Sequence, residues 1–507
     1  MPASPTDSTL RGPLALTVLC VVPLVLWAAS EPLDDRFRGS FATLTSIAVL
    51  LALAGTSAFA LNLVLGARLR LVEKLFGGLD RMYHAHRVTG QAAFALLFGH
   101  VTLVLAGRAT ISAESALALL GPGAGWTVFA GVLAFAAMTV SIVLTLFVRL
   151  GHEVFVYVQR SFGLVFLLAS YHVFTDPGPT AGSTALRAYL ALLATAGLVA
   201  FAYRSLLGNV LVRRRPYRVT AVNRLDEHVT EIVMEPRATP LVHDAGQFVF
   251  VNFRSLALRE GLRPFELSVE HQVFSIRAGE IRNQFHPFSI TSAPGAPELR
   301  ITVKAVGDYT RALRRLEPGA EAVVEGPYGS FSHLRVPSRR QVWIAGGIGV
   351  TPFLAMARSL GDEELEVDFY YCVEHAEEAH FLDELLELAS SSPGFRVVLV
   401  PRDREGFLTG SRLAEDVPDL ASRDVLVCGP PAMIVSLRAQ LRAEGVPAER
   451  IHAEEFSFAK LGPSPEAELA GVPQRWSDGQ VLALVAAFAA AGVAGGIGIV
   501  VGSYLGS

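Results

Sequence analysis

Long apolar stretches dominate the first part of the chain and predict a bundle of membrane helices. Six of them lie before residue 210, and most are close to the roughly 20 residues that a helix needs to cross a bilayer. Their approximate bounds are 13–29, 41–66, 89–106, 126–147, 158–174 and 188–207. The first stretch resembles a signal peptide, but more apolar segments follow it, so we interpret it as the first transmembrane helix.

A seventh apolar stretch lies at the C-terminal end, over residues 481–504. It is rich in glycine and alanine, which suits close packing against other membrane helices. The polar stretch before it contains proline and glutamate. We therefore predict a linker over residues 459–479 and an extra C-terminal transmembrane helix over residues 480–505.

Basic residues gather in alternate joints between the apolar stretches and predict the orientation of the bundle. One set of joints carries Arg68, Arg70, Lys74, Arg81, Arg87, Arg149, Arg160, Arg204, Arg213, Arg214 and Arg215. The opposite joints carry mainly acids, with a few arginines: Glu31, Asp34, Asp35, Glu114, Asp176, Arg36, Arg38, Arg108 and Arg187. Under the positive-inside rule, the N-terminus and the region after residue 212 face the cytoplasm.

The pattern changes after residue 213, where two further domains are predicted. Short strands separated by turn residues, at 217–223, 228–236, 247–253, 288–291 and 299–305, indicate a small antiparallel β-barrel. From residue 341, apolar strands at 342–345, 366–371, 396–400 and 424–428 alternate with helices at 352–359, 379–389 and 431–444. This alternation predicts an α/β domain with a parallel sheet.

Composition agrees with a membrane protein and excludes some classes of site. Hydrophobic residues make up 51% of the 507 residues and charged residues only 18%. The net charge of −4 argues against nucleic acid as a partner. The three cysteines, Cys20, Cys372 and Cys428, have no C-x-x-C spacing, so neither a disulfide framework nor a zinc site is indicated.

Histidines in the apolar helices are the main candidates for chemistry within the membrane. His86 and His100 lie 14 residues apart, close to four helical turns, so both rings point from one face about 21 Å apart. A single imidazole in hydrocarbon is ordinarily explained by a hydrogen bond to a neighbouring helix. A pair at this spacing, opposite His172 on the fifth apolar helix, instead predicts iron ligation.

Two segments around these histidines resemble the third and fifth helices of the ferric reductase and NADPH oxidase family. They are L-D-R-M-Y-H-A-H-R at 79–87, followed by His100, and H-E-V-F-V-Y-V-Q-R at 152–160, followed by His172. The resemblance implies two b-type haems, each held by one histidine from each helix. His100 and His172 would bind the outer haem, and His86 would bind the inner one.

The second ligand of the inner haem departs from the family pattern. The residue 13 positions before His172 is Gln159, not histidine. Three interpretations stay open. The inner haem is five-coordinate on His86, or His152 or His84 substitutes, or the inner haem is absent. The sequence therefore predicts one or two haems b.

The resemblance also bears on the electron acceptor. In the family's oxidases, an arginine on the second helix and a histidine one turn beyond the outer ligand flank the oxygen site. Here Gly55 and Val104 stand at those places. Without these positive groups, developing superoxide is not stabilised. We therefore favour ferric iron or a quinone as acceptor over oxygen.

The segment H-P-F-S-I-T-S at 286–292 resembles the flavin-binding strand of the same family. The alternative is an ordinary edge strand and turn. The resemblance implies that FAD contacts His286, Pro287, Phe288, Ser289, Thr291 and Ser292. Ser289 would lie near the flavin N5 and Phe288 along the ring, and His286 replaces an arginine found in many relatives.

A second motif, V-K-A-V-G-D-Y-T-R-A-L at 303–313, follows at the expected distance. A helix that begins after Gly307 offers free N–H groups to a pyrophosphate. An ordinary N-cap is compatible with this role. The residues assigned to FAD here are Lys304, Gly307, Asp308 and Thr310, with Arg311 adding positive charge.

Three later motifs predict a nicotinamide nucleotide site. A-G-G-I-G-V-T-P-F at 345–353 joins a strand to a helix, where glycines allow the dinucleotide to approach the backbone. By resemblance, Cys428 in C-G-P-P-A-M packs where nicotinamide meets flavin, and Phe456 or Phe458 covers the flavin. The residues assigned to the nucleotide are Gly346, Gly347, Gly349, Thr351, Pro352, Arg402, Gly429 and Pro430, and those assigned to catalysis are Cys428 and Phe458.

The choice between NADPH and NADH depends on charges near the adenosine end. Arg402 and Arg404 could hold a 2′-phosphate, whereas Glu374 would repel it. On family grounds alone we favour NADPH.

These observations together predict a multi-domain membrane protein with a six-helix transmembrane haem bundle. The domains are residues 1–212 (ferric reductase-like), 213–337 (FAD barrel) and 338–458 (nucleotide domain), with a solvated insertion at 254–282 that has no assigned function. We expect electrons to pass from NAD(P)H through FAD and haem to an extracytoplasmic acceptor. The alternatives are a superoxide-producing NADPH oxidase and a membrane-anchored flavoprotein scaffold without a haem relay.

The expected setting is a bacterial inner membrane, with membrane lipid around the bundle and the nucleotide-binding domains in the cytoplasm. The sequence gives no indication of the oligomeric state.

Overall fold

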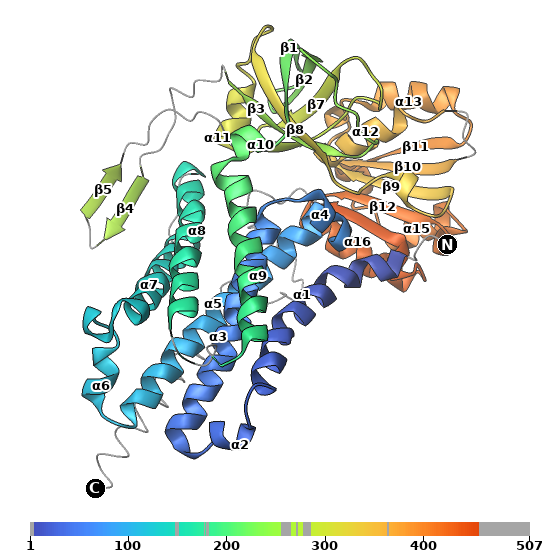
Figure 1. Ribbon diagram of the computed structural model, residues 1–507. Coiled ribbons are helices and arrows are strands. Elements are labelled where there is room, and N and C mark those ends of the chain that lie inside the picture. The colour runs from blue at the N-terminus through green and yellow to red at the C-terminus, as the bar shows by residue number, and fades with distance from the viewer. Residues whose placement is uncertain are drawn as a thin grey trace. The chain divides into compact units, whose positions relative to one another are not determined.

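A computed structural model describes residues 5–147, 152–176, 178, 182–254, 265–269, 272–276, 285–361 and 365–455. The described residues divide into two compact units, with the main boundary between Val212 and Arg213. Figure 1 draws the helical unit from blue to green and the mixed unit from green through yellow to red. The predicted domain boundaries within the second unit stay predictions.

The first unit is entirely helical. Its helices are α1 Pro5–Ala28, α2 Leu33–Arg36, α3 Gly39–Gly66, α4 Arg70–Phe76, α5 Leu79–Ala109, α6 Ala113–Ala118, α7 Trp126–Phe147, α8 His152–Thr175, α9 Thr184–Phe201 and α10 Gly208–Leu211. A π-helical turn, Ala202–Leu206, follows α9. The third apolar helix starts earlier than its hydropathy indicates, at Leu79, so His86 lies within it.

Five helices in the described part of the chain are long and apolar enough to cross a membrane. They lie at Arg11–Ala28, Gly39–Gly66, Arg81–Ala109, Trp126–Thr145 and Thr184–Leu206. The predicted fifth span is the helix α8, which has 24 residues but carries Gln159, Arg160 and His172. Its crossing of the membrane stays a prediction, and the C-terminal span and the linker before it lie outside the described residues.

Aromatic side chains join the long helices into one bundle. Phe59 of α3 meets Phe162 and Phe166 of α8, with ring centroids 6.2 and 4.9 Å away. Phe94 of α5 stacks on Phe135 of α7 with centroids 6.4 Å apart. Edge-to-face and offset contacts of this kind add to dispersion. These three contacts connect α3 to α8 and α5 to α7.

The second unit begins with the expected antiparallel barrel. Its strands are β1 Arg214–Arg224, β2 Val229–Pro236, β3 Phe248–Phe253, β6 His286–Ser289, β7 Leu299–Lys304 and β8 Glu321–Tyr328, and its helix is α11 Asp308–Leu313. The strand order is β6-β3-β8-β1-β2-β7. A bridge between Ile290 and Ile301 connects the two edges, so the barrel is nearly closed. Within the predicted insertion, β4 Phe265–Val269 and β5 Gln272–Ile276 form a separate hairpin.

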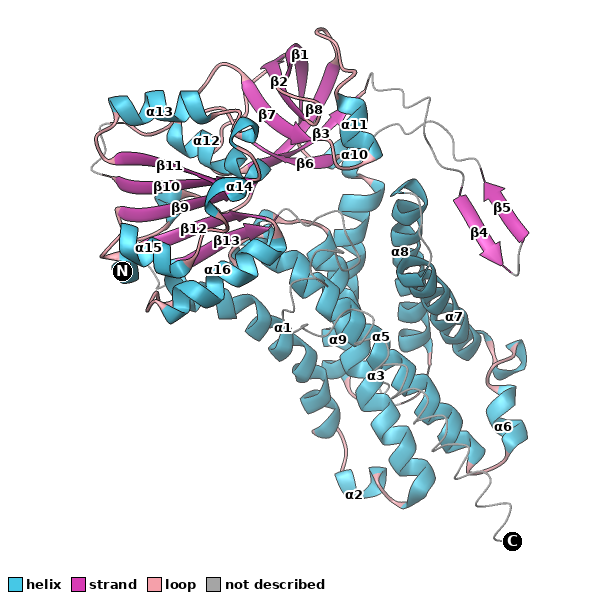
Figure 2. Ribbon diagram, turned by 180° about the vertical axis from the view of Figure 1, so that it is seen from behind, coloured by secondary structure: helices cyan, strands magenta, loops and turns pink. Residues whose placement is uncertain are grey.

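A five-stranded parallel sheet follows, as Figure 2 shows in magenta. Its order is β11-β10-β9-β12-β13. The elements are β9 Arg340–Gly346, α12 Thr351–Ala357, β10 Glu366–Val373, α13 Leu382–Ser391, β11 Phe395–Pro401, α14 Arg402–Glu405, α15 Gly410–Asp416, β12 Asp424–Gly429, α16 Pro431–Ala443 and β13 Ile451–Glu455. The edge strand β13 was missing from the sequence prediction.

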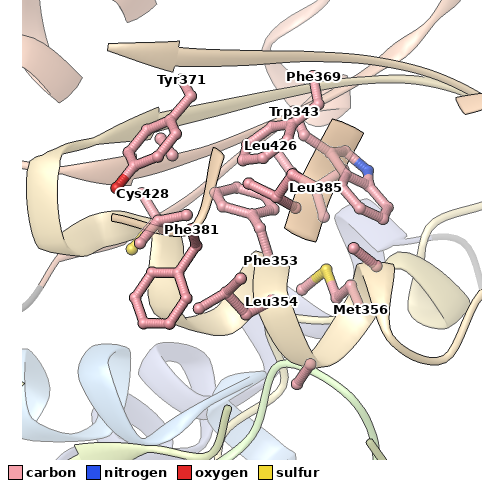
Figure 3. Close-up of a cluster of buried hydrophobic side chains, with 14 of the residues drawn as sticks. Trp343, Phe353, Leu354, Met356, Phe369, Tyr371, Phe381, Leu385, Leu426 and Cys428 are labelled. Carbon is pink, nitrogen blue, oxygen red and sulfur yellow. The ribbon is translucent and has the colours of Figure 1, made fainter. Parts of the chain in front are cut away.

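Short 3-10 helices complete the described elements: Pro122–Ala124, His333–Arg335, Gly347–Val350, Ala376–Glu378, Leu420–Ser422 and Ala448–Arg450. The sheet buries a core on each face. One core gathers aromatic side chains around Trp343, Phe353 and Phe369 (Figure 3). The other contains Tyr370 and Leu437, the latter from α16. Both faces of the parallel strands are thus covered, as the apolar strands predict.

Candidate functional site

The three membrane histidines share one hydrogen-bonding arrangement. Nδ1 of His86 lies 3.1 Å from the carbonyl oxygen of Asn62, and Nδ1 of His100 lies 2.9 Å from that of Ala48. Nδ1 of His172 lies 3.0 Å from the carbonyl oxygen of Thr127. A carbonyl oxygen only accepts, so each Nδ1 carries the hydrogen and each Nε2 keeps its lone pair. This is the tautomer of a metal-ligating histidine.

Neighbouring helices hold these rings closely. A Cβ atom at Gly131 of α7 would lie 2.9 Å from Cγ of His172, so only glycine leaves room for this ring. The amide of Asn62 donates to the backbone carbonyl of His86 at 2.5 Å, which pairs the two residues reciprocally. Val49, which follows Ala48, and Val173, which follows His172, pack against the same buried cluster. The structure thus brings the two predicted outer ligands into one region.

Gln159 is half-buried on α8, and His84 is exposed on α5. The side chain of His152 lies outside the described part. Among the described residues, no group of three or more His, Cys, Asp or Glu side chains could hold a metal ion.

Gly55 has a packing role. A Cβ atom there would lie 2.9 Å from Cγ of Leu97, because α3 and α5 approach each other closely at this point. A longer side chain would have to displace α5. The bundle thus offers no space for an arginine at this position.

The flavin motif lies on β6 and the turn after it. His286 and Pro287 are half-buried, whereas Phe288 and Ser289 are buried. The hydroxyl oxygens of Ser289 and Thr291 are buried, and neither has a hydrogen-bond partner within the described residues. An unpaired buried hydroxyl is costly, so both are suited to bind a ligand. Ser292 differs, because its hydroxyl accepts from the backbone N–H of Arg300 at 3.2 Å and helps to close the barrel.

Tyr309 is an additional residue near this motif. Its ring stacks on that of His286, with centroids 3.6 Å apart and planes at 22°. Burial raises the pKa of its phenol. Its place between Asp308 and Thr310 in the second motif was a signal that the sequence analysis did not use.

The start of α11 is less open than expected. The hydroxyl of Thr310 accepts from the backbone N–H groups of Gly307 and Val306, at 2.9 and 3.0 Å. The N–H group of Gly307, one of the residues assigned to the pyrophosphate, thus already has a partner. Lys304 is exposed, and the side chain of Asp308 is not described.

The glycine-rich turn lies between β9 and α12 and packs on the end of β12. A Cβ atom at Gly349 would lie 2.2 Å from the carbonyl oxygen of Cys428, so this turn requires glycine. Gly347 has a φ of +54°, beside open space. Gly346 and Gly429 lie against each other, and Pro430 precedes α16. Thr351 donates its hydroxyl to the carbonyl of Ile348 at 3.0 Å, and Pro352 is the second residue of α12.

Cys428 is fully buried beside Phe381 and Tyr371 (Figure 3). Burial, and then the charge of Glu454, raise the pKa of its thiol well above the usual value. The thiol is therefore neutral at physiological pH. Phe456 and Phe458, the candidates for the aromatic cover, lie outside the described residues.

The two opposing candidates for nucleotide specificity lie against each other. Nη2 of Arg402 lies 2.6 Å from Oε1 of Glu374. The Arg402 guanidinium also lies 5.1 Å from the ring centroid of Phe407, which is 75% exposed. In this ion pair, the negative charge of Glu374 neutralises the positive charge of Arg402 that a 2′-phosphate would need. This contact argues against the preference for NADPH.

One arginine that the sequence analysis did not consider joins the barrel to the α/β domain. Arg358, after α12, donates to the carbonyl oxygen of Thr291 at 2.7 Å. It also makes two bonds to the carboxylate of Glu384 on α13, at 2.6 and 2.8 Å. This arrangement connects the turn after the flavin motif to the nucleotide domain.

Models of two known protein families match this chain, one in the helical unit and one in the α/β domain. Residues 51–170 match the family model "Ferric reductase like transmembrane component", and residues 343–439 match "Oxidoreductase NAD-binding domain". These matches confirm the resemblance predicted from the histidine and glycine motifs. The NAD-binding match also supports nicotinamide nucleotide binding.

Two curated relatives are reductases. The ferredoxin–NAD(+) reductase component of the alkene monooxygenase system of Xanthobacter autotrophicus is 35% identical over 195 residues, which cover 35% of this chain and 58% of the relative. The glycine betaine monooxygenase reductase subunit of Chromohalobacter salexigens is 30% identical over 185 residues, which cover 33% and 50%. The chain thus spans about half the length of these relatives. Their names agree with the prediction of an oxidoreductase.

Among solved structures, a ferredoxin NADP+ reductase from Neisseria gonorrhoeae with bound FAD and NADP matches with a TM-score of 0.37. It is 19% identical, and the match covers 48% of this chain and 98% of that one.

Proposed function

We propose that this protein is a transmembrane oxidoreductase that passes electrons from NAD(P)H, through FAD and b-type haem, to an acceptor on the extracytoplasmic side. The observation that carries the proposal is the shared tautomer of the membrane histidines. A histidine with only a structural role has no need to reserve Nε2, whereas an axial ligand does. His100 and His172 would hold the outer haem, and His86 the inner one.

The barrel residues fit a flavin. The unpaired hydroxyls of Ser289 and Thr291 would bind its polar edge, and the stacked pair of His286 and Tyr309 offers an aromatic surface. When bound, FAD supplies the step from a two-electron hydride donor to one-electron acceptors. The buried residues around it, among them Phe288, exclude water from that site.

In the nucleotide domain, the turn from Gly346 to Gly349 would receive the dinucleotide. Cys428 lies under this turn as a neutral, buried thiol. It shapes the floor of the site without adding charge. Arg358 keeps this domain attached to the flavin motif through Thr291.

Superoxide production is the weaker alternative. The close contact of Gly55 with Leu97 excludes a cationic side chain that would stabilise reduced oxygen there. A scaffold without a relay is also disfavoured, because an anchor has no use for three histidines in the same tautomer.

The decisive experiment measures haem and flavin in the purified full-length protein. We expect a pyridine haemochrome signal of one or two haems per flavin, and anaerobic NAD(P)H should reduce this haem. His100→Ala and His172→Ala should remove the same haem, whereas His228→Ala, at an exposed position of the second unit, should remove none. Wild-type protein that retains flavin but no haem would refute the relay and favour the scaffold.

A further inference from the structure

The end of α1 and the start of α3 lie at one end of the bundle, next to α2 (Figure 1). A small pocket lies between these elements. Its volume is about 190 Å³. By the positive-inside rule this end is extracytoplasmic. The residues that line the pocket are Trp27, Glu31, Arg36, Thr45, Ser46 and Val49.

Arg36 places a buried positive charge in the wall of this pocket. Its side chain is 8% exposed, and its guanidinium lies 3.8 Å from the ring centroid of Trp27. It donates to the carbonyl oxygen of Trp27 at 2.5 Å and to the hydroxyl of Ser30 at 2.8 Å. These bonds, with that to Glu31, fix the planar guanidinium and use only part of its donor set.

The pocket lies next to the helix segments that carry the outer histidine pair. Val49 lines it, and the preceding residue, Ala48, accepts the hydrogen bond from His100. Trp27 belongs to a buried cluster against which Val49 and Val173 pack, and Val173 directly follows His172. A molecule in the pocket would therefore lie near both proposed ligands of the outer haem.

The elements around the pocket carry apolar side chains that face outward. Val25 on α1 is 59% exposed, and Leu33 at the start of α2 is 49% exposed. Phe37 and Phe41, before and within α3, are also exposed. In a membrane-spanning bundle, such side chains face lipid. Such side chains suit the approach of a ligand from the lipid phase.

We propose that this pocket binds the ring of a lipid-soluble quinone, the terminal electron acceptor. The inference rests on the proposed function, because the electrons come from NAD(P)H. The reaction converts NAD(P)H, one proton and the quinone into NAD(P)+ and the quinol. The quinone takes up two electrons, one at a time, and two protons, and both of its C=O groups become C–OH groups.

Size and chemistry favour a single ring. An apolar cavity of about 150 Å³ holds a benzene ring, so a pocket of about 190 Å³ suits one quinone ring rather than a bulky ferric chelate. Arg36 would donate to one quinone oxygen and stabilise the negative charge that develops there. Trp27 provides an aromatic wall. Glu31, 63% exposed and paired with Arg36, connects the pocket to water for proton uptake.

The test uses full-length protein in nanodiscs, with decylubiquinone as the probe. Two variants change the pocket differently: Arg36→Gln removes the charge, and Val49→Phe fills the space while Arg36 remains. Arg187→Gln is the matched control, since this exposed arginine lies at the same end of the bundle, near the start of α9. Trp27→Phe removes the tryptophan that lines the pocket, so the quenching that this variant loses is the quenching of Trp27.

We expect saturable quenching of Trp27 by decylubiquinone. Arg36→Gln and Val49→Phe should each weaken this binding at least about tenfold and slow quinol formation, while flavin content and ferricyanide reduction stay unchanged. Arg187→Gln should behave as wild type. Unchanged decylubiquinone affinity in both pocket variants would overturn the proposal. So would an equal loss of ferric citrate reduction, which would assign the pocket to soluble chelates.

The two proposals fail in different ways. If decylubiquinone quenches Trp27 but NAD(P)H does not reduce the haem, the binding site stands and the proposed electron path is wrong. If NAD(P)H reduces the haem but decylubiquinone causes no quenching that depends on Trp27, the path stands and the quinone site is wrong.

Discussion

Glu374 and Arg402 form a 2.6 Å ion pair at the point where the nucleotide domain would discriminate between NADPH and NADH. Glu374 follows β10, and Arg402 begins α14, so the two come from neighbouring strands of the parallel sheet. In the sequence they are opposing signals for the 2′-phosphate. In the folded protein they form an ion pair.

Breaking this pair should change the nucleotide preference. Glu374→Gln frees the Arg402 guanidinium for a 2′-phosphate, so kcat/KM for NADPH relative to NADH should rise about tenfold, equivalent to about 1.4 kcal/mol. Steady-state ferricyanide reduction with both nucleotides measures this ratio. Glu387→Gln is the control, because Glu387 is an exposed residue of α13. An unchanged ratio in Glu374→Gln would place the 2′-phosphate elsewhere.

Gly131 should be essential for the outer haem. A Cβ atom at this position would lie 2.9 Å from the ring of His172, so Gly131→Ala must shift the ring. We expect a changed Soret band or loss of one haem, with flavin content unchanged. Gly123→Ala is the control, since nothing lies within 4 Å of its added Cβ. Identical spectra for Gly131→Ala and wild type would contradict the assignment of His172.

Asn62 should act as a positioning residue for His86. Asn62→Leu removes the amide that donates to the His86 backbone while keeping similar bulk. Loss of such a supporting contact typically weakens metal binding by about 10–100-fold, and haem titration into apoprotein would measure it. Ser57→Ala, which loses only a bond within α3, should leave haem binding intact. Full binding by Asn62→Leu would refute this role.

Arg358 should link flavin binding to the stability of the second unit. Arg358→Ala removes bonds to Glu384 and to the Thr291 carbonyl, and such charged hydrogen bonds contribute about 1.5–3 kcal/mol each. We expect a lower unfolding midpoint and slower flavin reduction by NAD(P)H in rapid mixing. Arg315→Ala is the control, because Arg315 is exposed after α11 and its substitution removes the same charge. If flavin reduction stays at the wild-type rate, the bond to Thr291 is purely structural.

His333 should make the second unit less stable in mild acid. Burial lowers the pKa of His333 to about 4, from 6.5. Below pH 6.5 the unfolded chain binds a proton that the folded chain does not, so stability is greatest above pH 6.5 and falls as the pH drops to about 4. The loss is about 3 kcal/mol.

Thermal unfolding followed by flavin release between pH 7 and 4 would measure this dependence. His333→Phe keeps a ring near Trp343, 5.7 Å away in the wild type, and should flatten the pH profile. His228→Gln, at an exposed position, should leave the profile unchanged. A pH profile for His333→Phe as steep as that of the wild type would assign the acid sensitivity to another group.

The order of the elements follows from the sequence alone. Hydrophobic length determines that a segment such as Gly39–Gly66 can cross a membrane, and period-2 patterns determine the barrel strands. Both signals are local, because they depend on burial along a single element. The same locality explains the limits. The span predicted over α8 is not among the five described helices that are long and apolar enough to cross a membrane, and the edge strand β13 was missing from the sequence prediction.

The meaning of individual side chains depended on the tertiary structure. The sequence places His100 in an apolar helix, but only the fold brings Nδ1 to the Ala48 carbonyl and so defines the tautomer. In the sequence, Glu374 and Arg402 are separate charges. The parallel sheet brings them together as an ion pair. Likewise, Arg36 is an ordinary joint residue until α1 and α3 enclose it beside Trp27. Hydropathy and motifs depend on residues that are close together in the sequence, whereas contacts between residues far apart in the sequence form only when the chain folds.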